Sequence, residues 1–209
     1  MEIFTYLFAA LFSVLNPIGT VPIFVGLTQD YDKKERSVVA FWTAIDVFLI
    51  LFISYFIGEY VLNFFGISID ALRIAGGLII VSSGFSLLTG NFNKTRGINK
   101  QVEEEIQNRN DIALTPLAIP MLAGPGSMSL LIAFYQENHS TNAIIASVLA
   151  IFAVSVLIFV ILKSGHYLAK YLGASGIVAI SRIVGFIVIA IGIQYIVSAI
   201  INIIKGNFV

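Results

Sequence analysis

The sequence predicts an all-α, polytopic membrane protein with six transmembrane helices, and three observations lead to that fold class. Hydrophobic residues make up 58% of the 209 residues and charged residues only 11%, whereas a soluble domain carries about a quarter of its residues as charged side chains. The apolar runs are long and continuous, which favours helices over the alternating strands of a membrane barrel. The five prolines fall into two clusters in opposite halves of the chain, which indicates an internal duplication. A soluble globule is therefore excluded.

Six apolar stretches are each long enough to cross a hydrocarbon core about 30 Å thick, which needs roughly 20 helical residues. We place these spans at about residues 3 to 27, 38 to 62, 71 to 90, 113 to 135, 143 to 163 and 177 to 204. The first stretch lacks the basic residues that begin a secretory signal, and Asn16-Pro17 interrupts it. We expect it to remain in the mature protein.

Basic residues in the connections predict how the chain is oriented. Nine of them fall in the odd-numbered connections: Lys33, Lys34, Arg36, Lys94, Arg96, Lys100, Arg109, Lys163 and Lys170. Arg73 and Lys205 lie on the opposite side. Because basic loops stay in the cytoplasm, we expect both termini outside it. The polar connection at about 91–112 carries Ile98, Val102 and Ile106 at helical spacing, which predicts a short helix on the membrane surface.

Recurring landmarks indicate that the chain contains two copies of a three-span unit. Pro17 and Pro125 are 108 residues apart, and three further motifs recur in order at nearly the same offset. They are Gly58-Glu59-Tyr60 with Gly165-His166-Tyr167, Gly66-Ile67-Ser68 with Gly173-Ala174-Ser175, and Arg73-Ile74-Ala75-Gly76 with Arg182-Ile183-Val184-Gly185. We therefore expect one transmembrane domain over 1–209, with repeat one at about 1–90 and repeat two at about 113–209. Three spans is an odd number, so the copies are inverted.

Spans one and four are expected to be interrupted, because proline removes a backbone donor and clashes with the preceding turn. Unwound backbone within a membrane is tolerated only where protein buries it or a wet cavity lines it. Two helix N-termini meeting near the midplane would bind a carboxylate, and free carbonyls would bind an ammonium group, so a small zwitterion fits. The alternative is that the prolines only kink the spans for packing. The candidate substrate-binding residues are Asn16, Pro17, Gly19, Thr20, Ala123, Gly124, Pro125, Gly126 and Ser127.

Three ionisable residues are candidates for coupling or gating. Asp46 lies near the centre of span two, where a charge is costly. It is either a carboxylate that couples protons or contacts a substrate amine, or a neutral acid that hydrogen-bonds a neighbouring helix. Arg73 and Arg182 begin spans three and six; they either reach the lipid headgroups or tether a broken helix or a carboxylate as a gate. Separately, Gly77 with Gly84 and Gly185 with Gly192 predict close helix packing.

Composition also limits the chemistry. Twelve basic residues balance twelve acidic ones without forming a basic stripe, so nucleic acid is not expected as a partner. The chain has no cysteine and only two histidines, and we expect no metal and no cofactor. No nucleophile with a plausible base and no pair of deep carboxylates is present, so we do not expect an enzyme.

Two motifs resemble those of a known family. Asn16-Pro17-Ile18-Gly19-Thr20-Val21-Pro22-Ile23-Phe24 and Pro116-Leu117-Ala118-Ile119-Pro120-Met121-Leu122-Ala123-Gly124-Pro125-Gly126-Ser127 resemble the MarC family of bacterial and archaeal inner-membrane proteins, and the resemblance covers essentially the whole chain. That family is grouped with the LysE-type exporters and includes transporters of glycine and alanine coupled to protons. The resemblance implies a proton-coupled secondary transporter of small neutral amino acids in the inner membrane, with the substrate between the two interrupted helices. The alternative is an exporter of other small metabolites or amphipathic compounds.

Overall fold

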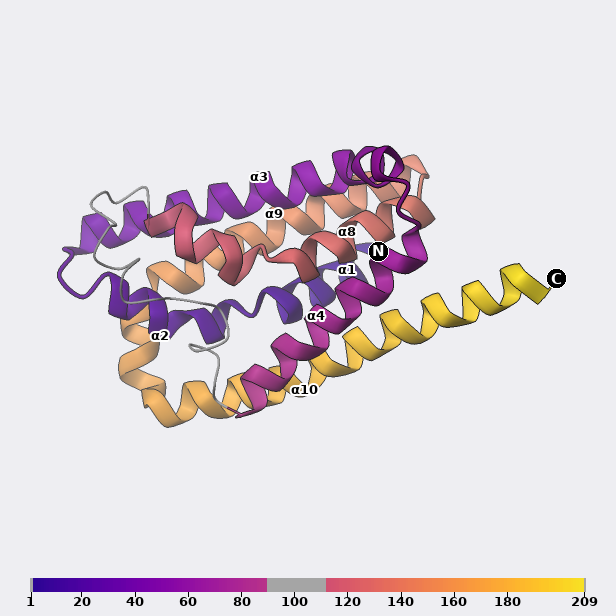
Figure 1. Cartoon of the computed structure of the whole chain (residues 1–209). Helices are drawn as coiled ribbons and strands as arrows, with labels where there is room; N and C mark the ends of the chain where they lie inside the picture. The colour runs from indigo at the N-terminus through magenta and orange to yellow at the C-terminus, as the bar shows by residue number, and fades with distance from the viewer. Residues whose placement is uncertain (1, 90–111, 209) are drawn as a thin grey trace.

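The computed structural model describes residues 2–89 and 112–208, and every regular element among them is helical (Figure 1). The helices are α1 (Glu2–Leu15), α2 (Pro17–Leu27), α3 (Lys33–Phe65), α4 (Ile69–Thr89), the π-helix η1 (Ala113–Leu122), α8 (Pro125–Glu137), α9 (Thr141–Lys163) and α10 (Gly165–Phe208). The predicted all-α class is confirmed for this part of the chain. The surface helix predicted within 91–112 falls almost entirely outside the described residues.

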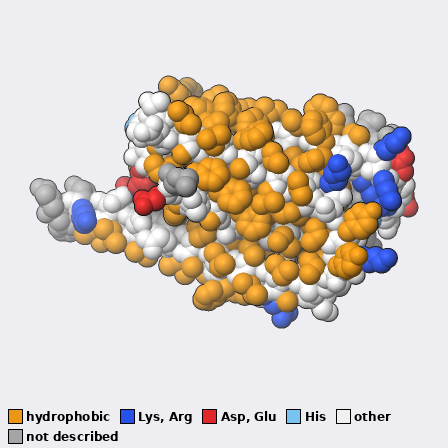
Figure 2. Space-filling model, turned by 180° about the vertical axis from the view of Figure 1, so that it is seen from behind, with side chains coloured by type: hydrophobic (Ala, Val, Ile, Leu, Met, Phe, Trp, Pro, Cys, Tyr) orange, Lys and Arg blue, Asp and Glu red, His pale blue; other side chains and the backbone are white. Residues whose placement is uncertain are grey.

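Four helices are long and apolar enough to cross a membrane: α3, α4, α9 and the Ser175–Lys205 part of α10. The pair α1 and α2 makes a fifth candidate, bent by 40°. The pair η1 and α8 occupies the place of the expected fourth span. Figure 2 shows a broad apolar surface with most of its basic side chains gathered at one end. Lipid is the solvent that suits such a surface, so the chain is an integral membrane protein.

Local sequence signals place the starts of the helices. The Asp32 carboxylate accepts a hydrogen bond from the Glu35 amide at 2.7 Å, and Glu35 returns the interaction to the Asp32 amide at 2.8 Å, which forms a capping box before α3. Ser140 caps α9 by accepting from the Ala143 amide at 3.2 Å. Asp32 and Ser140 are 108 residues apart, so the second helix of each half begins at the same register.

Two glycines mark equivalent bends before the last long helix of each half. Gly66 ends α3 with a φ of 66°, and Gly173 interrupts α10 with a φ of 62°. They are the only glycines with positive φ among the described residues, and glycine adopts this conformation without the steric penalty of a Cβ atom. This pair is the one that the repeated Gly-x-Ser motif matches in the sequence.

Helix contacts follow a reciprocal pattern between the two halves. α1 packs on α9 and η1 packs on α3; likewise α2 packs on α10 and α8 packs on α4. Each contact in such a pair becomes the other when the halves are exchanged. The remaining large contacts, α3 with α9 and α4 with α10, join helices in equivalent positions. A two-fold axis between the halves requires this reciprocity. The start of α1 and the end of α10 lie toward the same end of the bundle (Figure 1).

The contact between α4 and α10 depends on four glycines. A Cβ atom on Gly84 would lie 2.8 Å from the Gly185 carbonyl oxygen, and one on Gly185 would lie 2.9 Å from the Gly84 carbonyl oxygen. Gly77 and Gly192 make the same reciprocal approach, with corresponding distances of 2.8 Å and 2.7 Å. Small residues let membrane helices approach this closely. The close packing predicted from these glycines is confirmed.

Candidate substrate site at the interrupted helices

The first interruption is a single residue, Asn16. Its amide donates to the Phe12 carbonyl at 3.0 Å, which ends α1, and its backbone turns to the left-handed region at φ 44°, ψ 61°. The following residue, Pro17, disfavours the α conformation at Asn16, and asparagine tolerates the left-handed region better than most residues. The Asn16 Oδ1 atom then accepts from the Gly19 amide at 3.3 Å and caps α2.

The carboxamide of Asn16 has an unused donor. Asn16 is only 1% exposed, and its Nδ2 group finds no acceptor among the described residues. An unsatisfied buried donor costs about 1 to 3 kcal/mol, so native structures rarely retain one without a function. The hydrogen bond from the Gly19 amide fixes which atom is the oxygen. The unused donor therefore lies at the N-terminus of α2, where the helix dipole is positive.

The second interruption is built differently. Thr115 and Ile119 precede prolines and adopt extended angles (φ −130°, ψ 119° and φ −117°, ψ 126°) inside η1, as expected from the clash between a proline ring and the preceding residue. The π-helix closes when the Ala123 amide donates to the Ala118 carbonyl at 2.8 Å. Gly124 is extended, and α8 then begins at Pro125. Both new helices thus start with proline in the first turn, where its missing N–H is not needed.

The two interruptions belong to one region of the bundle. Leu15 beside the first, and Leu122 and Ala123 beside the second, belong to the same buried cluster. α2 contacts η1 and α1 contacts α8, so the first part of each broken pair meets the second part of the other. In Figure 1 both interruptions fall near the middle of the bundle's long axis. This arrangement brings two positive helix ends into the protein interior, where they can stabilise an anionic group.

Of the nine predicted binding residues, all except Pro125 are buried. The hydroxyls of Thr20 and Ser127 are already engaged: Thr20 donates to the Asn16 carbonyl at 3.3 Å, and Ser127 donates to the Gly124 carbonyl at 2.8 Å. The sequence led us to expect these carbonyls and hydroxyls to be open. The structure differs because the side chains satisfy the carbonyls that each interruption frees. Each carbonyl keeps one further lone pair for a ligand.

Asp46 lies on α3, partly buried at the edge of its packed face. No basic side chain of the described residues is within ion-pair distance of it. Its expected role in coupling stays a prediction. Across residues 2–89 and 112–208, no three His, Cys, Asp or Glu side chains cluster as metal ligands do.

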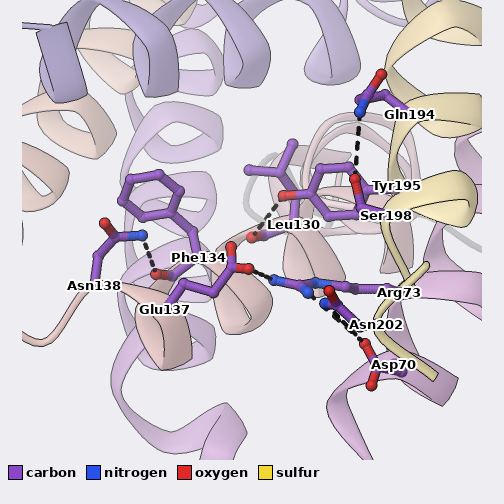
Figure 3. A network of polar contacts seen from close by, with 10 residues as sticks. All are labelled: Asp70, Arg73, Leu130, Phe134, Glu137, Asn138, Gln194, Tyr195, Ser198 and Asn202. Atoms are coloured by element: carbon purple, nitrogen blue, oxygen red, sulfur yellow. Dashed lines mark hydrogen bonds and ion pairs between the residues drawn. The ribbon is translucent and has the colours of Figure 1, made fainter. Parts of the chain in front are cut away.

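The two repeat arginines have different surroundings. Arg73 on α4 is 5% exposed and forms ion pairs with Glu137, at the end of α8, and with Asp70 at 3.8 Å (Figure 3). Arg182 is exposed on α10, and no acidic side chain of the described residues pairs with it. Tethering to a carboxylate thus describes Arg73 and not Arg182. Glu137 has Gln29 at the repeat position, so the second half lacks the charge that the first half uses.

Sequence reasoning missed the polar network around Arg73. The Asn202 carboxamide donates to Asp70 at 3.5 Å, and the Tyr195 hydroxyl donates to the Leu130 carbonyl at 3.3 Å (Figure 3). The network joins α4, α8 and α10 at one end of the bundle. The only signal for it was the repeat itself, because the offset of 108 places Glu137 beside the end of the fourth span just as it places Gln29 beside the first.

Comparison with known proteins identifies the family. A model described as MarC family integral membrane protein matches residues 1–204. The chain is 34% identical over 199 residues to the membrane protein YhcE of Escherichia coli, covering 95% of this chain and 92% of that protein. It is 36% identical over 200 residues to the membrane protein MJ1677 of Methanocaldococcus jannaschii, covering 96% and 97%. It is also 36% identical to the inner membrane protein MarC of Escherichia coli O157:H7, covering 94% and 93%. No solved structure matches. The chain, with its two interrupted helices, therefore belongs to the MarC family of integral membrane proteins.

Proposed function

We propose that this protein is a secondary transporter that moves small neutral amino acids, such as glycine or alanine, across the inner membrane. One observation carries the proposal: two helices begin inside the bundle, and the Asn16 carboxamide at one of them has a buried N–H group without an acceptor. A carboxylate is the ligand that such donors and dipoles favour. Broken helices that expose their ends near the midplane are the usual binding device of secondary transporters.

The surroundings of the interruptions favour a small zwitterion. The Asn16 N–H group and the first amides of α2 and α8 suit the carboxylate. The second lone pairs of the Asn16 and Gly124 carbonyls suit the ammonium group. The residues around them are mainly glycine, alanine, threonine and serine, and Leu15 and Leu122 pack close by with full burial. A bulky side chain on the substrate would have to displace this packing.

Alternating access follows from two inverted halves that rock against each other. The reciprocal helix contacts and the glycine crossing of α4 and α10 support this arrangement. The ion pair of Arg73 and Glu137 ties α4 of one half to α8 of the other, which is the position required of a gate at one end. We further propose that Asp46 is the proton-coupling carboxylate and that both termini face away from the cytoplasm.

The test is uptake by proteoliposomes that contain the purified protein. We expect saturable uptake of labelled alanine or glycine, increased by an imposed proton gradient and lost in the Asn16→Gly variant. Lys170→Gln is the matched control, because it changes an exposed residue far from the interruptions in sequence. Wild-type protein that neither binds nor moves any member of an amino acid panel would refute the proposal.

A further inference from the structure

A groove outside the interrupted helices runs between the start of α3 and the end of α9. Its volume is about 370 Å³, and it is lined by Lys34, Ser37, Val38, Phe41, Trp42 and Phe159. The two helices are in contact, and the groove opens on the apolar outer surface, where Val38, Phe41 and Trp42 are all exposed. It is independent of the proposed transport site.

Two lysines make one end of this groove positive. Lys34 lies in the first turn of α3, where the helix dipole is also positive. Lys163 is the last residue of α9, and its Nζ atom lies 5.2 Å from the centre of the Phe159 ring. Neither lysine pairs with a carboxylate among the described residues. Glu35, the nearest acid along the chain, is committed to the capping box with Asp32.

The rest of the groove is aromatic. Phe41 packs edge-on against Trp42 at 6.0 Å and against Phe159 at 6.1 Å between ring centres. Trp42 follows Lys34 by about two helical turns, which is roughly 12 Å along α3. A positive end followed by an apolar wall at this separation matches a phospholipid, whose phosphate lies above its acyl chains. Tryptophan is also enriched at this depth of a membrane.

The equivalent positions of the other half lack these features. At the offset of 108, Lys34 corresponds to Asn142, Phe41 to Leu149 and Trp42 to Ala150. The charge and the aromatic wall therefore occur at one end of the bundle only, the end at which most basic side chains gather in Figure 2. Charge complementarity then selects among lipids. We propose that this groove is a binding site for one anionic phospholipid of the leaflet that faces the connection between α2 and α3.

Trp42 is the only tryptophan of the chain, so its fluorescence reports on the groove directly. The experiment reconstitutes the full chain in bilayers that mix phosphatidylcholine and phosphatidylglycerol, with bromine on the acyl chains of one lipid at a time. Each basic residue near an anionic surface strengthens lipid binding about fivefold. We therefore expect brominated phosphatidylglycerol, present as the minor lipid, to quench Trp42 as though enriched on the order of tenfold beside it.

Variants separate a specific site from general attraction of charge. The double variant Lys34→Gln, Lys163→Gln should lose the preference, so that both brominated lipids quench in proportion to their amounts. The control Lys170→Gln, Lys205→Gln removes the same charge from exposed positions outside the groove and should keep it. Equal quenching by both lipids in the wild type would overturn the proposal. So would a preference that survives in the first double variant or is lost equally in the control.

Discussion

The crossing of α4 and α10 is symmetric between the two halves, whereas the two interrupted helices are not. At the crossing, Gly84 meets Gly185 and Gly77 meets Gly192, and each approach has an equal counterpart within 0.1 Å. At the interruptions, Asn16 in a left-handed conformation corresponds to Gly124 in an extended one. The ion pair of Arg73 likewise has no counterpart at Arg182 among the described residues.

This difference separates packing from chemistry. Where two backbones touch, only glycine fits, and both copies of a repeat must satisfy the same steric condition. A small zwitterion has no two-fold symmetry, so a site between the halves needs different groups on its two sides. We therefore expect substitutions at the crossing to have matched effects in both halves, and substitutions at the interruptions to have unmatched effects.

The largest expected effect is on packing at the crossing. Gly84→Ala and Gly185→Ala should each lower the free energy of unfolding by about 2 to 3 kcal/mol, because the added Cβ atom meets a backbone oxygen that cannot move aside. Thermal unfolding in detergent measures this. Gly26→Ala is the control, since nothing lies within 4 Å of its Cβ position. Losses that differ widely between the two halves would break the symmetry.

Asn16→Gly should have the next largest effect, and that effect is on binding. Glycine keeps the left-handed backbone without strain, so the fold is retained. The lost N–H group should weaken alanine binding on the order of tenfold or more, as expected for a hydrogen bond to a charged group. Calorimetric titration measures the affinity. Ser127→Ala, which removes a hydroxyl already bonded to Gly124, should have the smaller effect; the reverse order would contradict the assigned roles.

Removing the gate's charge should have a moderate effect at one end only. Glu137→Gln leaves the buried Arg73 with Asp70 as its remaining ion-pair partner. Because Glu137 is itself 55% exposed, the expected loss of stability is about 1 to 2 kcal/mol, less than for a fully buried pair. Arg182→Gln should change stability by less than about 0.5 kcal/mol. Equal losses in thermal unfolding would mean that Arg182 has a partner equivalent to Glu137.

The smallest effect concerns His166, which lies between the spans and replaces the Glu59 of the first half. Burial lowers the pKa of the His166 imidazole, and the Arg36 guanidinium lowers it further. The unfolded chain therefore binds this proton more readily, with a pKa of about 6.5. Stability should fall as the pH drops through that value and should not depend on His166 above it. Melting temperatures of His166→Gln, compared with those of His139→Gln, test the slope; an identical slope in both variants would contradict it.

Much of the fold was predictable from sequence because its signals are local. Hydropathy located the spans, and the prolines located both interruptions to within a residue or two, since a proline acts on its own turn. The repeat placed Gly66 and Gly173 at equivalent bends. The roles of Thr20 and Ser127 were not predictable, because their hydroxyls choose between a ligand and a carbonyl one turn away. The partner of Arg73 was hidden because Glu137 lies 64 residues further along the chain.

The central claim is that the donors of the interrupted helices bind the carboxylate of a small zwitterion. Calorimetric titration of the purified protein with alanine and with ethylamine tests this most directly, because ethylamine keeps the ammonium and methyl groups and lacks the carboxylate. The account predicts saturable binding of alanine and binding of ethylamine weaker on the order of tenfold or more. Equal affinity for the two compounds, or alanine binding that Asn16→Gly leaves unchanged, would contradict it.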